Sequence, residues 1–138
     1  MFSSINHKAV IITAIGVQIL HFIWYSPYLF FDSWIKAQGI LSEDYSRDGI
    51  LFFYSTIAML LSAYFIAWLL PRLGIINGAQ GIQFMILFMF FGVAPIIFTY
   101  YSFLHISYKV YLIDMGNLLI NAAFIGYILG SWQKHPYH

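Results

Sequence analysis

The chain has 138 residues, of which 62% are hydrophobic and only 8% are charged, and its formal net charge is +1. A soluble domain carries about 25% charged residues, so this composition excludes an ordinary soluble globule and indicates a chain that contacts lipid. The near-neutral charge without a basic run argues against nucleic-acid binding, and the absence of Cys excludes disulfides, thiolate metal sites and Cys nucleophiles.

Four runs with almost no charge divide the chain, and each is long enough to cross a bilayer. They cover residues 9–31, 49–70, 81–104 and 110–132. A hydrocarbon core of about 30 Å takes about 20 residues of helix, and backbone groups away from water must bond within that helix. The sequence therefore predicts an all-α fold, a single polytopic membrane domain over residues 1–138 with four transmembrane helices in an up-down-up-down bundle.

The first run ends in a stretch rich in aromatic residues, HFIWYSPYLFFDSW. Trp and Tyr concentrate where a helix leaves the membrane, so we interpret most of these rings as an interfacial anchor. Pro27 lacks a backbone donor and predicts a kink in this helix. Gln18, His21 and Tyr25 recur at i, i+3 and i+7, which places them on one face of the helix.

The connection 32–48 is the only one long enough for structure of its own, and the short connections elsewhere place both termini on one side. Lys and Arg divide evenly, with Lys8, Arg72 and Lys134 on the terminal side and Lys36, Arg47 and Lys109 on the other. The positive-inside rule therefore does not decide the orientation. The acidic loop residues all lie opposite the termini, which favours cytoplasmic termini. For a multi-pass protein of this kind we expect a location in the cell (inner or plasma) membrane.

Polar residues in the third and fourth runs fall in the leaflet of the 32–48 connection. Asp114, Asn117 and Asn121 recur at i, i+3 and i+7 on the fourth helix. Thr99 and Ser102 occupy the same leaflet on the third helix, where Pro95 predicts a second kink. An Asp at a helix centre in a membrane costs about 2.5–3.5 kcal/mol, so we expect such groups to face one another.

The polar faces of the first and fourth helices lie at matching depths. With a rise of about 1.5 Å per residue, Tyr25 and Asn117 lie about 10 Å from the loop side, and His21 and Asn121 about 15 Å. Antiparallel helices would bring these pairs level with each other. The sequence predicts a polar pocket lined by His21, Tyr25, Gln18, Asp114, Asn117, Asn121, Thr99 and Ser102.

Each of these residues also has a purely structural interpretation. Asp114 lies about one turn from its helix start, where it could be hydrated or stabilised by the helix N-terminus. His21 could be a neutral packing residue, and the two Asn residues could only bond helices together. The pattern does not choose between these interpretations and a working pocket.

The fourth helix also carries small residues on a different face, namely Ala122, Gly126 and Gly130 in a G-x-x-x-G pattern. Small residues at this spacing let helix backbones approach closely. The pattern predicts a helix–helix interface, formed either with a second copy of the chain or with another helix of the same chain.

Signatures of catalysis are sparse in this sequence. No spacing such as H-x-x-x-H or E-x-x-H indicates a metal site, and neither a nucleophile elbow nor a Gly-rich phosphate loop occurs. We therefore predict no metal and no cofactor, and a membrane-embedded enzyme is the least favoured class.

Two segments resemble a known family. WYSPYLFFDSWIKAQGI is similar to the opening, and YLIDMGNLLINAAFIGYILGSW to the closing helix, of small bacterial membrane proteins catalogued as domain of unknown function 1761. The chain departs from that pattern around Asn117 and Leu118, where the family often has Tyr-His. The resemblance implies a four-helix membrane protein and no particular activity.

The sequence thus predicts an integral membrane protein, a homo-oligomer (dimer favoured) surrounded by membrane lipid. Its pocket would bind or pass a small solute, a lipid headgroup or a proton. The alternative from another class is a structural or accessory protein whose polar residues only hold helices together.

Overall fold

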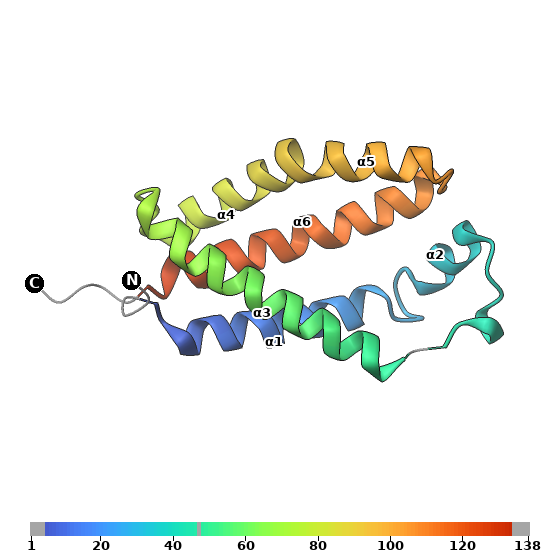
Figure 1. The fold of residues 1–138 in the computed structure, drawn as a ribbon, viewed down its shortest axis with the longest axis horizontal. Helices are drawn as coiled ribbons and strands as arrows, with labels where there is room; N and C mark the ends of the chain where they lie inside the picture. The colour runs from blue at the N-terminus through green and yellow to red at the C-terminus, as the bar shows by residue number, and fades with distance from the viewer. Residues whose placement is uncertain (1–4, 47, 134–138) are drawn as a thin grey trace, which may run out of the picture.

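The computed structural model describes residues 5–46 and 48–133, and within them it is all-helical without strands (Figure 1). In chain order the elements are α1 (His7–Trp24), α2 (Phe31–Gln38), the short η1 (Ser42–Asp44), α3 (Gly49–Arg72), α4 (Gly78–Leu87), η2 (Phe88–Val93), α5 (Ala94–Phe103) and α6 (Tyr108–Ser131). Four helices, with α4 to α5 counted as one, are long and apolar enough to cross a membrane. The predicted all-α class with four potential spans is confirmed. Arg47 and Lys134, which entered the charge count, lie outside the described residues.

Polar side chains cap the start of all four spans, including α6, where the hydroxyl of Ser107 accepts from the backbone N–H of Lys109. Asn6 accepts a hydrogen bond from the backbone N–H of Ala9 at the start of α1, and Asp48 accepts one from Ile50 at the start of α3. Asn77 does the same for Gln80 at the start of α4. Asn and Asp are favoured at these positions because their oxygens satisfy N–H groups that have no partner within the helix.

The first span is shorter than the sequence predicts. α1 ends at Trp24 rather than at residue 31, and the chain turns through Ser26 and Pro27 before α2 begins. The physical reason is that a proline disfavours helical geometry in the residue before it and offers no N–H to continue the ladder. Pro27 therefore ends the helix where we predicted a kink, and α2 becomes a separate short helix (Figure 1).

Pro95 has a milder effect in the third span. The helix continues through this residue, but the turn before it, η2, is π-helical. A π-helical turn accommodates a missing donor by widening the hydrogen-bond ring. The span therefore remains a continuous helical path from Gly78 to Phe103.

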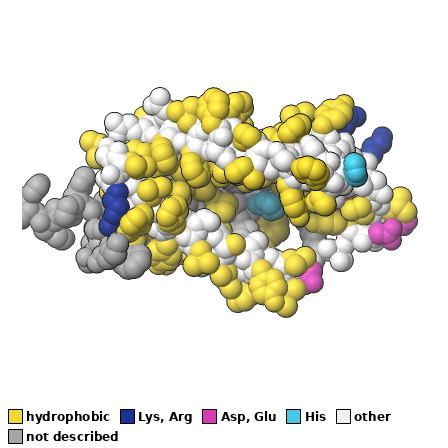
Figure 2. Space-filling view, turned by 45° about the horizontal axis from the view of Figure 1, so that its top comes forward, with side chains coloured by type: hydrophobic (Ala, Val, Ile, Leu, Met, Phe, Trp, Pro, Cys, Tyr) yellow, Lys and Arg dark blue, Asp and Glu magenta, His cyan; other side chains and the backbone are white. Residues whose placement is uncertain are grey.

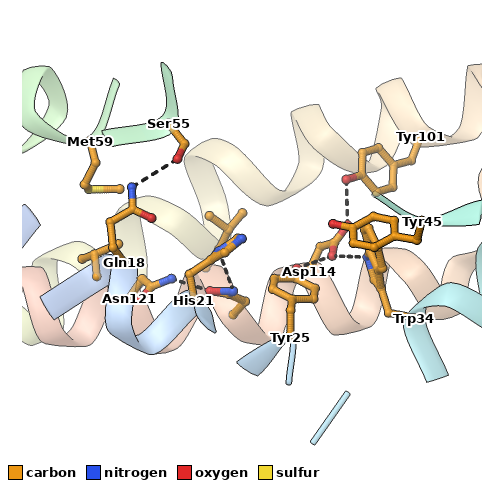
Figure 3. Close-up of a pocket in the computed structure, with 13 residues that line it drawn as sticks. Gln18, His21, Tyr25, Trp34, Tyr45, Ser55, Met59, Tyr101, Asp114 and Asn121 are labelled. Atoms are coloured by element: carbon orange, nitrogen blue, oxygen red, sulfur yellow. Dashed lines mark hydrogen bonds between the residues drawn. The ribbon is translucent and has the colours of Figure 1, made fainter. Parts of the chain in front are cut away.

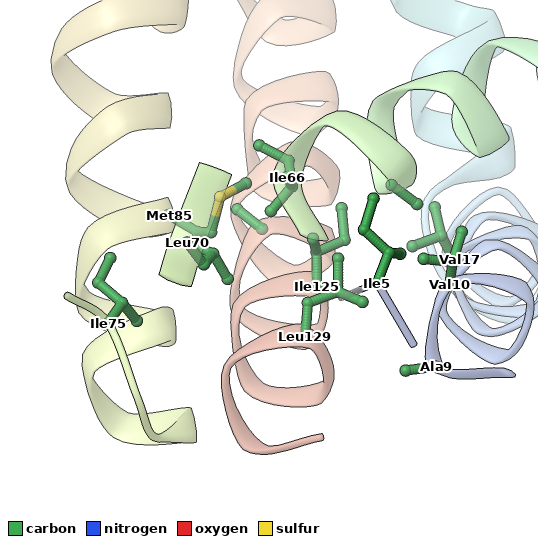
Figure 4. Close-up of a cluster of buried hydrophobic side chains, with 12 residues drawn as sticks. Ile5, Ala9, Val10, Val17, Ile66, Leu70, Ile75, Met85, Ile125 and Leu129 are labelled. Carbon is green, nitrogen blue, oxygen red and sulfur yellow. The ribbon is translucent and has the colours of Figure 1, made fainter. Parts of the chain in front are cut away.

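An apolar core holds the bundle together at the end where α1 begins and α6 ends (Figure 4). It joins side chains from α1, α3, α4 and α6, among them Val10 and Leu70, both fully buried. Thr13 is also fully buried, and its hydroxyl is paired because it donates to the carbonyl of Ala9 at 2.7 Å. Asn6 links the two chain ends of the bundle by donating to the carbonyl of Trp132.

The small residues of α6 pack against α4 of the same chain. A Cβ on Gly126 would overlap the backbone of Gly81, and a Cβ on Gly130 would meet the carbonyl of Asn77. Ala122 is fully buried in the apolar core. The sequence allowed this face to pack either against a second copy or against another helix of the same chain. In the structure it packs against α4 of the same chain.

The outer surface of the bundle is largely apolar (Figure 2). In α3 only 11% of the most apolar 18-residue window is buried inside the protein, although its mean hydropathy is 2.0. Charged side chains gather toward the two ends in Figure 2. An exposed apolar surface of this extent is consistent with a multi-pass membrane protein.

Candidate functional site

A hollow opens between α1, α3 and α6, in the part of the bundle beyond the apolar core (Figure 3). Its volume is about 430 Å³, within the range of about 300–1,000 Å³ that is typical of small-molecule sites. The residues that line it are Val17, Gln18, His21, Tyr25, Trp34, Tyr45, Ser55, Met59, Tyr101, Asp114, Asn117, Leu118 and Asn121. Six of the eight predicted pocket residues are in this set.

Asp114 is the centre of the hydrogen bonds at one end of the hollow. Its Oδ1 atom accepts from the hydroxyl of Tyr25 and, at 2.9 Å, from the indole N–H of Trp34. Its Oδ2 atom accepts from the hydroxyl of Tyr101 at 2.8 Å. These bonds tie α6 to the end of α1, to α2 and to α5. All three donors are neutral, so they stabilise the carboxylate without cancelling its charge.

A second group of polar side chains forms a chain of hydrogen bonds deeper in the hollow. Asn121 donates from its amide nitrogen to Oδ1 of Asn117, and the amide nitrogen of Asn117 lies 3.3 Å from Nδ1 of His21. Asn121 is only 6% exposed, and among the described residues its own Oδ1 atom has no hydrogen-bond partner. A buried amide oxygen without a partner is costly, which marks a position where a bound donor would be stabilised.

Gln18 connects the same side of α1 to α3. Its amide nitrogen donates to the hydroxyl oxygens of Ser55, at 3.2 Å, and Thr56, at 3.1 Å. Ser55 lines the hollow, so one wall of the site comes from α3. The polar stripe predicted on α1 therefore bonds to α6 through His21 and Tyr25, and to α3 through Gln18.

The polar stripes of α1 and α6 meet one turn away from the expected register. His21 contacts Asn117 rather than Asn121, and Tyr25 bonds Asp114 rather than Asn117. The predicted depths of the residues on the first helix assume that this helix continues to residue 31. Because α1 ends at Trp24, the predicted depths of its residues do not match their positions beside α6.

Thr99 and Ser102 do not enter the hollow. Both side chains are exposed, and their hydroxyls donate to carbonyls one turn earlier in their own helix, those of Pro95 and Phe98. Hydroxyls on membrane helices commonly bond to the i−4 carbonyl, which satisfies them without another helix. The sequence indicated the depth of Thr99 and Ser102 in the membrane. It did not indicate on which face of the helix their side chains lie.

Sequence reasoning missed three aromatic members of the site. Trp34 ends the aromatic stretch whose rings we interpret mostly as an interfacial anchor, and no sequence pattern pointed to Tyr45 or Tyr101, yet all three line the hollow. Tyr28 belongs to the same stretch and is 96% exposed. The available signal was the polar atom that each Trp and Tyr carries, since such atoms need a partner when the ring is buried.

The described residues do not assemble a metal centre. Among them, no group of three or more His, Asp or Glu side chains lies close enough together to hold an ion. Asp114 has aromatic donors around it instead. The arrangement is a hollow with one carboxyl group beside the rings of Tyr25, Trp34 and Tyr101.

Comparison with known proteins places the chain in a family. The family described as "Protein of unknown function (DUF1761)" matches residues 8–130, which includes every residue that lines the hollow. Neither the curated proteins nor the solved structures contain a match. The match covers far more than half of the sequence and agrees with the resemblance seen at both ends of the chain. The chain is a member of the DUF1761 family.

Proposed function

We propose that this protein is a multi-pass membrane protein that binds a small polar molecule in the hollow between α1, α3 and α6. The observation that carries the proposal is the half-buried Asp114 on the wall of a hollow of about 430 Å³. A carboxylate within membrane-spanning helices is expensive, and functional sites are where such groups are retained. The unpartnered Oδ1 atom of Asn121 supports the proposal, because a ligand donor could satisfy it.

The proposed arrangement in the membrane follows the sequence prediction. The four spans would cross up-down-up-down in the cell membrane, with both termini cytoplasmic. A homodimer remains part of the proposal, but Gly126 and Gly130 already contact α4. A second copy would therefore have to use another face of the bundle.

Blocking the hollow tests whether it binds anything. Ser55 is an exposed residue on its α3 wall, and Ser55→Phe would fill part of the space while Gln18 keeps Thr56 as an acceptor. We expect the wild-type protein in lipid nanodiscs to bind at least one of three radiolabelled probes at millimolar concentration: choline, acetate or glycerol. Ser55→Phe should abolish that binding, as measured by equilibrium dialysis.

A matched control separates blocking from general damage. Ser102→Phe adds the same side chain at an exposed position outside the hollow, so it should bind the probes as the wild type does. If none of the three probes binds to the wild type, or if both variants bind equally well, the proposed function is wrong.

The second candidate is a structural or accessory role. It is favoured by the bonds from Asn121 through Asn117 to His21 and by those of Gln18, because polar side chains in membranes often serve to join helices. Under this candidate, Asn121→Leu would lower the thermal unfolding temperature or change the oligomeric state. It would not affect probe binding, because there would be none.

A further inference from the structure

The hollow carries negative charge with no positive side chain to balance it. Among the described residues that line it there is no Lys or Arg, whereas Asp114 contributes a carboxylate. A second hollow of about 310 Å³ shares Gln18, His21, Tyr25, Tyr45 and Ser55 with the first and reaches Asp48. The path from the loop end of the bundle into the site therefore passes two carboxylates, which favours a cation over an anion or a neutral solute.

The carboxylate of Asp114 has little room for additional donors. A carboxylate has about four positions at which it accepts hydrogen bonds, and Tyr25, Trp34 and Tyr101 occupy three of them. A hydrated ion or a polyamine would need several acceptors at this point. A cation that relies on charge rather than on many hydrogen bonds fits this site better.

The aromatic rings of Tyr25, Trp34 and Tyr45 lie near Asp114 (Figure 3). The rings of Tyr25 and Trp34 are 5.3 Å apart and inclined by 65°, and those of Trp34 and Tyr45 are 5.9 Å apart and inclined by 87°. In each pair the edge of one ring meets the other ring, so the three rings hold one another in place, and all three residues line the hollow beside Asp114. Aromatic walls beside a carboxylate are the means by which proteins bind alkylammonium groups, through attraction of the cation to the ring faces.

His21 does not supply the missing positive charge in this arrangement. Its Nδ1 atom lies 3.3 Å from the amide nitrogen of Asn117, and an imidazole nitrogen that accepts from an amide is unprotonated. The ring of His21 lies 4.7 Å from that of Tyr25, which extends the aromatic wall toward Asn121.

We infer that the ligand is an organic cation with an alkylammonium group, held between the carboxylate of Asp114 and the rings of Tyr25, Trp34 and Tyr45. This inference rests on the proposed function and specifies its ligand class. The cation could be a free solute or the quaternary ammonium of a lipid headgroup, since both present the same chemistry.

Calorimetric titration of the full chain in phosphatidylglycerol nanodiscs tests the charge requirement. The probes are choline and its neutral analogue, in which a carbon atom replaces the nitrogen. We expect choline to bind and the neutral analogue to bind at least about tenfold more weakly, because the two differ only in charge. In Asp114→Asn, choline affinity should fall toward that of the analogue, because only the attraction to the rings remains, and the affinity of the analogue itself should not change.

Asp114→Asn is suited to this test because it preserves the hydrogen bonds of the site. The amide oxygen of Asn can accept from Tyr25 and Trp34, and its nitrogen can donate to the hydroxyl oxygen of Tyr101. A second variant tests the aromatic wall without touching Asp114. Tyr45→Leu should weaken choline binding, whereas Tyr45→Phe should retain it, because only the former removes the ring.

The lipid composition of the nanodiscs shows whether the cation is a free solute or a lipid headgroup. Adding phosphatidylcholine to the nanodiscs should weaken choline binding if the quaternary ammonium of the headgroup competes for the site, and should leave it unchanged if the ligand is a free solute. Either result supports the alkylammonium assignment.

Two results would overturn the inference, and they differ from failure of the proposed function. If choline and its neutral analogue bind equally, or if Asp114→Asn binds choline as the wild type does, the ligand is not a cation. If Ser55→Phe nevertheless abolishes the probe binding seen with the wild type, the hollow remains a binding site, but for a solute that is not a cation. If the wild type binds neither choline, acetate nor glycerol, both proposals fail together.

Discussion

Replacing Asp114 by Leu is expected to release α2 from the bundle and to lower the stability of the whole protein. Leu is similar in size but accepts no hydrogen bond, so Tyr25, Trp34 and Tyr101 would lose their shared acceptor. An orphaned donor costs about 1–3 kcal/mol, and these three are half-buried, so the lower end of that range applies to each and the sum is about 3 kcal/mol.

Thermal unfolding in nanodiscs, followed by circular dichroism, measures this loss, and hydrogen exchange of residues 31–38 measures the release of α2. Asp114→Asn is the control, because it keeps an acceptor for Tyr25 and Trp34 and should unfold near the wild-type temperature. Wild-type stability and unchanged exchange in Asp114→Leu would contradict the role of Asp114 as the group that joins these helices.

Gly81→Ala is expected to separate α4 from α6. A Cβ at this position would overlap the carbonyl oxygen of Gly126. The atoms it would meet all belong to the backbone of α6. A side chain could rotate out of the way, but two helix backbones can only move apart. Overpacking of a well-packed contact costs about 1–3 kcal/mol, and we expect the upper end of that range because the whole helix must shift.

The same substitution at Gly49 provides the control for Gly81→Ala. A Cβ on Gly49 would meet nothing within 4 Å, and this residue also lies in a helix. Gly81 lies inside α4 and Gly49 is the first residue of α3, so the helix propensity of Ala favours the Gly81 variant at least as much. A lower unfolding temperature of Gly81→Ala than of Gly49→Ala therefore reports the close contact. Equal unfolding temperatures would show that α4 and α6 do not approach as closely as the structure indicates.

Much of the fold could be predicted because the physics behind it is local to each segment. The length and apolar character of four runs are sufficient to predict four helices, since a chain in lipid must satisfy its backbone within each helix. The i, i+3, i+7 spacing likewise identified Asp114, Asn117 and Asn121 as one face of α6. All three line the hollow.

Features that depend on contacts between segments could not be predicted in this way. Trp34 belongs to the site because the turn at Pro27 brings α2 against α6, and a sequence pattern does not record where a turn directs the next helix. Thr99 and Ser102 have a polar group at a suitable depth but on the outer face. The spacing of Gly126 and Gly130 indicated a close contact without identifying α4 as the partner.

An experimental structure in lipid tests the central claim most directly, namely that the hollow beside Asp114 is a binding site. The protein in nanodiscs with choline added should show density between Asp114 and the rings of Trp34 and Tyr45, in a hollow that opens toward the 32–48 connection. A dry interior in which side chains pack against Asp114 and leave no space would contradict the claim, and would assign these polar residues to holding the helices together.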